Sequence, residues 1–403
     1  MRYYRIVPGI ALAILLIVLT TNAFIGLIKD GGARAQGLHN AILYTGVLNI
    51  IPVIAVFLLI VSASFFAREE VLRLGVYYKI MIVWAACTCF WAPEKNIAII
   101  SFSYILAIPA ASALFVKYFD GDEIYECFKF AVIFVGTMSF FWALFIPDYG
   151  IAADSEHDGL WQGVFTHKNS LGMYSVIAIA MILALKPALY KDIYGIGAIG
   201  LHFILLIKSG SSTSMLAAAL MCFTYIFTNI FSNVRDSSVV HQRLVSGFVV
   251  VLTIITLLIT LVYLDPSYYP LVPDSILSRV YIWSYGWGLF SESTIGGLGV
   301  NQYAYLNERG FSDMEAILGY SVGSSHNASL ETLVSYGVVG LVFYIVMMAG
   351  LSKLMVYRIG FGGAIVFLSV FMVLGVTESV NFGYNFPFFI LTMLSLLNSR
   401  KGG

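Results

Sequence analysis

The repeated occurrence of apolar runs about 20 residues long is the feature that most limits what this chain can fold into. A helix needs roughly 20 apolar residues to cross about 30 Å of hydrocarbon. Only 11% of the 403 residues are charged, whereas a soluble chain carries about 25%. We therefore predict an all-α integral membrane protein. Its twelve predicted spans lie near 8–28, 41–66, 72–91, 96–118, 125–146, 170–186, 193–207, 211–232, 244–264, 328–352, 362–377 and 383–399.

The basic residues orient these spans, because lysine and arginine concentrate in cytoplasmic loops. An even number of spans puts both termini on one face, and that face is predicted to be cytoplasmic. It holds Arg2, Arg5, Arg68, Arg73, Lys117, Lys129, Lys186, Lys191, Arg235, Arg243, Lys353, Arg358, Arg400 and Lys401. The opposite face receives half as many: Lys29, Arg34, Lys95, Lys168, Lys208, Arg279 and Arg309, while Lys79 falls inside a span.

The predicted organisation has three parts. Residues 1–264 form nine spans with an outer loop over 147–169, residues 265–327 form a long outer loop, and residues 328–403 form the last three spans. Loops beyond about 15 residues are usually functional or disordered, and the 265–327 loop keeps aromatic residues that disorder would not retain. Within it, 275–290 has helical spacing. We expect a small, partly helical outer domain.

Composition excludes several classes of partner. Lys and Arg together number 22, as do Asp and Glu, so no net charge points to nucleic acid. The four cysteines lie in or beside apolar segments and imply neither disulfides nor a thiolate metal site. The acidic clusters at 120–123 and 154–158 are interpreted as a solvated loop and a polar loop, with oxygen coordination of a cation by the second left as the alternative. No metal or cofactor is predicted.

Polar clusters gather at the outer helix ends, where they point to one site assembled from several helices. They include Trp91–Asn96, Gly163–Gly172, Lys208–Ser214, Ser278–Trp283, Gly297–Gly299, Ser325–Glu331 and Glu378. The alternative is that loops are polar wherever they occur.

Two of these clusters have the pattern of anion sites at helix starts. Asn169 and Ser170 would cap the sixth span, with His167 and Lys168 at its positive end, where an anion fits. Lys208 and Ser211 repeat this arrangement at the eighth span. Ordinary capped turns are the alternative for both.

Arg279 and His326 are the two strongest candidates for chemistry. Arg279 could hold a phosphate bidentately, with Trp283 nearby to stack on sugar or lipid or to seat its helix in the membrane interface. His326 precedes the tenth span and Glu331 follows about one turn later, close enough to orient an imidazole; the sequence leaves open whether Glu331 or Glu378 assists His326. Such a histidine is a candidate general base, although a lone histidine is more often structural.

Taken in order, these motifs resemble those of the O-antigen ligase and polymerase superfamily of bacterial inner-membrane proteins. The likeness covers about residues 84–380. It rests on an upstream Trp91-Ala-Pro-Glu94, then Gly163-x-Phe165-x-His167-Lys168-Asn169-x-x-Gly172, Ser209–Ser214, Ser278-Arg279-x-x-Ile282-Trp283, Gly297-x-Gly299, and His326-Asn327-x-x-Leu330-Glu331 with Gly337 and Gly340.

The resemblance implies a glycosyltransferase-C-like bundle of about twelve spans that works without a metal or nucleotide-sugar. It implies transfer of a glycan from an undecaprenyl diphosphate-linked donor to an acceptor hydroxyl at the periplasmic face, with His326 catalytic and Arg279 on the diphosphate. Asn327 belongs to the same motif and joins the expected substrate contacts. A second arginine of the family is replaced here by Ser212, so Lys208 or Lys168 would supply the second charge.

The resemblance also sets the expected partners. These are the lipid-linked donor, a glycan or lipid A–core acceptor, membrane lipids and a chain-length regulator protein. The His-Lys-Asn form looks closer to exopolysaccharide polymerases than to ligases. The rival class is a transporter of lipid-linked glycans, which the outward bias of the polar groups disfavours.

Overall fold

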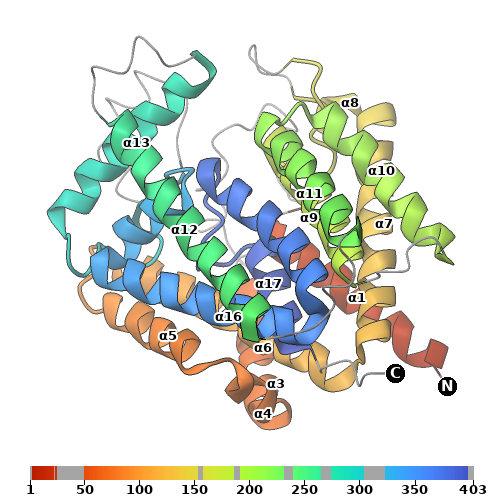
Figure 1. The fold of residues 1–403 in the computed structure, drawn as a ribbon, viewed down its shortest axis with the longest axis horizontal. Coiled ribbons are helices and arrows are strands. Elements are labelled where there is room, and N and C mark those ends of the chain that lie inside the picture. Colours follow the sequence, from red (N-terminus) through yellow and green to blue (C-terminus); the bar gives the residue numbers. More distant parts are fainter. Residues whose placement is uncertain are drawn as a thin grey trace.

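The described part of this chain is helical. The computed structural model describes residues 2–21, 23–24, 50–152, 158–185, 191–230, 239–264, 274–303 and 323–397. Within these ranges no strand occurs, and a single antiparallel bridge joins Ile151 to Trp161. Figure 1 shows the helices in chain order. Their bounds are α1 Arg2–Thr21, α3 Ile50–Phe66, α4 Arg68–Arg73, α5 Val76–Thr88, α6 Lys95–Tyr118, α7 Gly121–Phe145, α8 Pro147–Gly150, α9 Lys168–Leu185, α10 Ile193–Ser209, α11 Ser212–Ile230, α12 Val239–Tyr263, α13 Asp274–Glu292, α16 Ala328–Thr377 and α17 Phe386–Leu396.

Each predicted apolar run overlaps one of these helices. The two runs before the last, 328–352 and 362–377, both lie in α16. In the described ranges, six helices are long and apolar enough to cross a membrane: α6, α7, α9, α11, α12 and α16. Shorter apolar helices account for the other runs. The helix predicted at 275–290 is confirmed as α13. The count of twelve spans and the outer domain, of which 265–273 and 304–322 lie outside the described residues, stay predictions.

The outward surfaces of these helices are apolar, as expected where lipid replaces water. Large side chains at least 60% exposed occur on many helices, among them Phe57, Phe65, Leu216, Phe223 and Leu244. A soluble protein rarely leaves so much apolar surface uncovered. The chain is therefore a multi-pass membrane protein.

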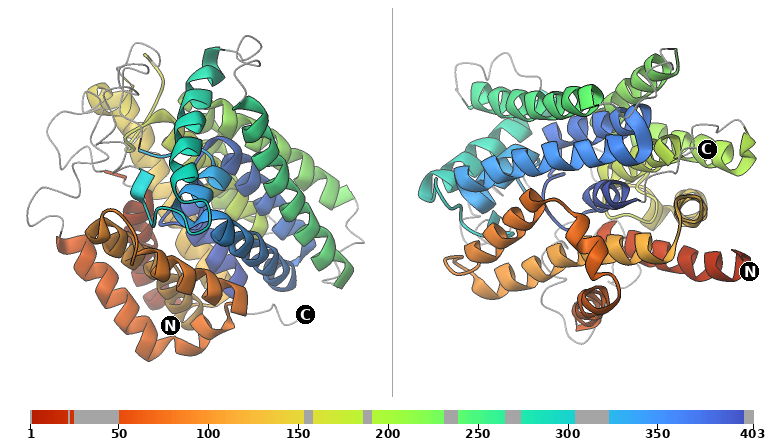
Figure 2. Two further views of the ribbon diagram at one scale, coloured as in Figure 1. Left: turned by 90° about the vertical axis from the view of Figure 1, so that its left-hand side faces the viewer. Right: turned by 60° about the horizontal axis from the view of Figure 1, so that its bottom comes forward.

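The C-terminal helices occupy the middle of the bundle. α16 packs against α12 on one side and α5 on the other, and α17 packs against α6. Figure 2 shows the blue C-terminal helices between the green and orange ones. All residues of α17 are buried. The core is thus built around the last segment of the chain.

α16 is a hairpin and not one straight rod. At 1.5 Å per residue, its 50 residues would span about 75 Å if straight. Gly360 interrupts the helix with φ 83°, a backbone conformation that favours glycine. The two ends of α16 meet again, because the Asn327 side chain donates to the Val376 carbonyl at 3.1 Å. This agrees with the two spans predicted from the sequence.

A second break at Gly337 explains the glycine motifs. Gly337 has φ 68°, and a Cβ there would lie 2.1 Å from the Ile295 carbonyl oxygen. The segment after α13 docks its backbone into this break, with Leu298 N–H donating to Val334 O at 2.7 Å and Gly299 N–H to Ser335 O at 3.0 Å. In a membrane every backbone group needs such a partner. The glycines therefore permit backbone contact between these segments.

The upstream tryptophan motif joins the same region. Trp91 donates its indole N–H to the Gly297 carbonyl at 2.9 Å. The Glu94 backbone N–H donates to Gln302 Oε1 at 2.9 Å, and Gln302 returns a bond to the Glu94 carbonyl at 3.2 Å. The motif Trp91–Glu94 thus braces the segment after α13.

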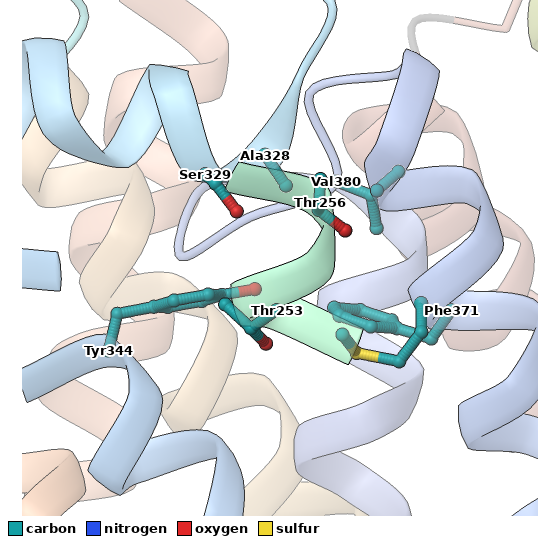
Figure 3. A pocket seen from close by; sticks show the side chains of 9 residues that line it. Thr253, Thr256, Ala328, Ser329, Tyr344, Phe371 and Val380 are labelled. Carbon is teal, nitrogen blue, oxygen red and sulfur yellow. The ribbon is translucent and has the colours of Figure 1, made fainter. Parts of the chain in front are cut away.

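A small cavity lies between α12 and the two arms of α16, which are otherwise packed together. Figure 3 shows its walls, formed by Thr253 and Thr256 of α12, Ser329 and Tyr344 of the first arm, and Phe371 of the second. Both threonine hydroxyls donate to carbonyls of their own helix, at 2.9 and 2.8 Å. The cavity is therefore mainly apolar, and it lies immediately beside the residues considered next.

Candidate active site

Side chains from α9, from α13 and from the segment before α16 converge on the carboxylate of Glu378, which follows the last residue of α16. Its Oε1 accepts from Arg279 of α13 at 3.2 Å and from the Asn169 side chain at the start of α9 at 3.5 Å. Its Oε2 lies 3.3 Å from Nδ1 of His326, which precedes α16. At the start of α11, Thr213 bonds to Thr377 at 2.6 Å. The sequence placed Glu378 among the outer polar clusters and left open whether Glu378 or Glu331 assists His326.

His326 is held in an unusual backbone conformation. Its φ is 49°, in the left-handed region that non-glycine residues seldom adopt. Such strain persists only where the surroundings fix it, and it concentrates at functional sites. The His326 side chain is 32% exposed, against 14% for Glu378. A molecule arriving from outside therefore reaches the imidazole before the carboxylate.

Glu331 supports the turn that carries His326 and makes no hydrogen bond to its ring. The Glu331 Oε2 atom accepts from the Ser325 backbone N–H at 2.7 Å and from the Ser379 hydroxyl at 3.4 Å. It lies in the first turn of α16, where a negative charge is favourable. The carboxylate bonded to the imidazole is Glu378.

Arg279 reaches the C-terminal end of α16 with its guanidinium group. Nη1 donates to the Thr377 carbonyl at 2.6 Å and Nη2 to Glu378 at 3.2 Å. A cation at a helix C-terminus complements the helix dipole. These bonds use two of the five guanidinium N–H groups, and the side chain is 18% exposed. Arg279, the residue predicted to bind phosphate, thus lies next to His326, since both contact Glu378.

The environment of Glu378 favours its ionised form. Burial alone would raise the pKa of its carboxyl, but the hydrogen bond with His326 and the charges of His326, Arg279 and His167 outweigh burial and lower that pKa. The carboxylate is thus negative at neutral pH and acts only as a hydrogen-bond acceptor.

The start of α9 differs from its predicted capping. His167, and not Asn169, provides the cap: its Nδ1 accepts the Asn169 backbone N–H at 3.1 Å. The prediction that Asn169 and Ser170 cap the helix is wrong, because the Asn169 side chain turns to Glu378 instead. His167 is exposed and Lys168 half-buried at this helix start. The polar end of α9 therefore belongs to the cluster around Glu378.

Lys208 and Ser211 lie at the neighbouring turn between α10 and α11. Lys208 occupies the last turn of α10 and not the start of α11, with its ammonium 5.6 Å from the centre of the Trp161 ring. Ser211 is buried and bonds to Ser214 at 2.9 Å. A Cβ on Gly172 of α9 would meet Ser211, which shows why small residues occur on both helices. Phosphate binding by Lys208 and Ser211 stays a prediction.

Trp283 and Asn327 are both buried. The Trp283 indole is 2% exposed, and its N–H has no hydrogen-bond partner among the described residues. Asn327 Oδ1 accepts the Leu330 N–H at 2.9 Å and so caps α16, while Nδ2 donates to Thr260 Oγ1 at 2.9 Å. Substrate contact by either residue stays a prediction. In this structure, Asn327 connects α12 to both ends of the hairpin.

Replacing Asn327 with alanine is expected to lower the free energy of unfolding by about 2 kcal/mol, because the change removes a helix cap and leaves buried groups unpaired. Thermal unfolding of the purified protein in detergent would measure this loss. Asn229→Ala is the matched control, since Asn229 is exposed on α11 and its hydrogen bond among the described residues is to the Tyr225 carbonyl of the same helix. Equal unfolding temperatures for the two variants would contradict the assigned role.

The described ranges contain no group of three or more acidic, histidine or cysteine side chains able to hold a metal. The 120–123 cluster is not a solvated loop: Asp120 caps α7 in a reciprocal capping box with Glu123, which is buried. Of the 154–158 cluster, only Asp158 lies within the described residues.

The comparisons with known proteins agree with the motifs. Residues 197–345 match the model of a protein family described as O-antigen ligase. The match covers 149 of the 403 residues. This match supports the resemblance to the O-antigen ligase and polymerase superfamily. The match includes Arg279 and His326 but not His167–Asn169 or Glu378. No curated protein matches the chain.

Proposed function

We propose that this protein transfers a glycan from an undecaprenyl diphosphate-linked donor to an acceptor hydroxyl at the periplasmic face of the bacterial inner membrane. Its preferred reaction is polymerisation of lipid-linked repeat units of an exopolysaccharide or O-antigen. The observation that carries the proposal is the convergence of His326 and Arg279 on one carboxylate at the ends of membrane helices. A base beside a cation suits attack by a hydroxyl with departure of a diphosphate.

In the proposed reaction, the acceptor oxygen forms a bond to the anomeric carbon of the donor glycan. The bond from that carbon to the diphosphate oxygen breaks, and its electron pair leaves with the diphosphate. His326 accepts the hydroxyl proton on Nε2 and later releases it to water. The Arg279 guanidinium, with Lys168 and His167 at the start of α9, stabilises the charge that develops on the diphosphate.

The periplasmic location of the site is supported by the distribution of the basic residues. They are twice as frequent on the predicted face opposite the site, and basic residues concentrate in cytoplasmic loops. The donor class is supported by the setting of the site. Charged groups lie at helix ends, where a diphosphate would meet the membrane surface while a polyprenyl tail stays in hydrocarbon. No step of the proposed reaction uses a metal or a nucleotide-sugar.

Ligation of the glycan to lipid A–core is the second candidate reaction. It is favoured by the description of the matching family, O-antigen ligase, over residues 197–345. The two reactions use the same donor and differ in the molecule that carries the attacking hydroxyl. A chain-length regulator protein would be a partner of the polymerase only.

An in vitro assay separates these reactions. The purified full-length protein in detergent would receive a labelled undecaprenyl diphosphate oligosaccharide, with and without lipid A–core, in the presence of a metal chelator. We expect a ladder of products from the donor alone. A single shifted band that requires lipid A–core would establish the ligase instead. If neither product forms and the wild type equals His326→Ala, the transferase assignment is overturned and a transporter becomes the better assignment.

A further inference from the structure

Glu378 bridges the two halves of the proposed chemistry. One oxygen, Oε1, faces Arg279 and Asn169, while the other, Oε2, faces His326. The carboxylate is less exposed than either of these neighbours, since 14% of its side chain is accessible against 18% for Arg279 and 32% for His326. It therefore lies beneath the groups that a substrate would meet first.

We infer that Glu378 is a positioning residue, which fixes the imidazole of His326 with its proton on Nδ1 and holds Arg279 beside it. This inference deepens the proposed function and rests on it. A carboxylate that accepts from one ring nitrogen determines which nitrogen carries the proton. With Nδ1–H directed at Glu378, the lone pair on Nε2 is free to accept the hydroxyl proton. Without the carboxylate, either tautomer and several ring orientations become available.

The charges around the carboxylate support this role. Arg279 faces Glu378 from α13, His167 from the start of α9 and His326 from the start of α16, and Glu331 interacts with His326 from the first turn of α16. Glu378 therefore remains ionised, and the proton on Nδ1 of His326 stays on the ring. When His326 becomes imidazolium during transfer, the adjacent negative charge stabilises it. One side chain thus orients the base and stabilises its protonated form.

The position of Arg279 depends on the same group. Its guanidinium is held between the Thr377 carbonyl and Glu378 Oε1, and Thr377 is itself bonded to Thr213 of α11. The cation and the base are consequently attached to a single element, the end of α16. A diphosphate on Arg279 would place the donor glycan next to the imidazole.

The test uses the purified full-length protein and the labelled undecaprenyl diphosphate oligosaccharide, with rates measured across pH. Glu378→Gln is expected to lower kcat by about 10²- to 10⁴-fold, the range for losing the carboxylate behind a catalytic histidine. The KM for the donor should change less. The acidic limb of the profile should move to lower pH, because an amide stabilises an imidazolium less than a carboxylate does. Glu378→Asp keeps the charge and should restore part of kcat without moving that limb.

Glu292→Gln is the matched control, since Glu292 is an exposed acid at the end of α13 and should leave both kcat and the profile unchanged. A Glu378→Gln variant with wild-type kcat and an unmoved acidic limb, alongside an inactive His326→Ala, would overturn the inference and leave the proposed function standing. Full activity in His326→Ala would overturn both. If Glu378→Gln does not fold, wild-type kcat in Glu378→Asp would overturn the inference.

Discussion

Replacing His326 with alanine is expected to lower the rate of glycan transfer by about 10²- to 10⁴-fold, the usual contribution of a general base. The loss should appear in kcat, because the imidazole acts on the proton that moves during the reaction. The ring is 32% exposed, and its described polar contact is the bond to Glu378. Its removal should therefore leave the fold intact. Product formation from the labelled donor at saturating concentration would measure the effect.

His241→Ala is the control for this variant. His241 lies near the start of α12, packed on the Phe361 ring at 5.0 Å. It is far from Thr260, which contacts Asn327 near the other end of the same helix. We expect that variant to retain transfer. Full product output from His326→Ala, with normal yield and unfolding temperature, would remove His326 from the chemistry and with it the proposed mechanism.

Replacing Arg279 with lysine is expected to lower kcat/KM by about 10- to 10²-fold, even though the charge is kept. Nη1 and Nη2 of Arg279 hold two different acceptors, the Thr377 carbonyl and Glu378. A lysine ammonium is a point charge and lacks this planar fork. Losing one hydrogen bond to a charged group costs about 1.5–3 kcal/mol, which corresponds to the predicted range. The same variant should weaken donor binding, because less of the cation remains for the diphosphate.

Initial rates at several donor concentrations would measure this change. Arg243→Lys is the matched control, since Arg243 is exposed on α12 near the end distant from the site. Wild-type kcat/KM in Arg279→Lys would exclude Arg279 from the diphosphate site. An Arg243→Lys variant with the same loss would show that the effect is general and not local.

The helices and the region of the site were predictable from the sequence for a simple reason. In a membrane, apolar runs must become helices, and polar groups that cost energy there mark function. The clusters at His167–Asn169, Arg279 and His326 each lie at a predicted helix end, and the structure brings them together. Their order along the chain also carried the resemblance to the family that residues 197–345 match.

The partners within the site were not predictable in the same way. Glu331 and Glu378 were both open as the carboxylate that assists His326, and Glu331 is the closer in sequence, but its side chain is bonded to Ser325 and Ser379. Glu378 is 52 residues from His326. Its approach depends on the hairpin of α16, and hence on a break at Gly360 that the hydrophobic pattern located only as a gap between two spans. A contact between residues so far apart in the sequence produces no local sequence pattern that would predict it.

For the glycine motifs, the sequence predicted the residues but not the reason for them. Gly297, Gly299 and Gly337 were recognised as part of a family pattern but had no physical explanation in the sequence. The structure supplies one. A Cβ at Gly297 or Gly337 would meet the backbone of the other segment, and a Cβ at Gly299 would meet Ala92. Any residue with a Cβ at Gly337 would collide with the Ile295 carbonyl. The glycine at this position is therefore explained by packing.

The hairpin of α16 also determines when the site can exist during biosynthesis. A ribosome delivers His326 to the membrane before Gly360, and Gly360 before Glu378, so the first arm must enter the bilayer without the group that will later bind its histidine. The second arm then has to return beside the first to bring Thr377 and Glu378 to Arg279. The site is thus chemically incomplete in a nascent chain until Glu378 has been inserted, and insertion of the second arm is the final assembly step of the site.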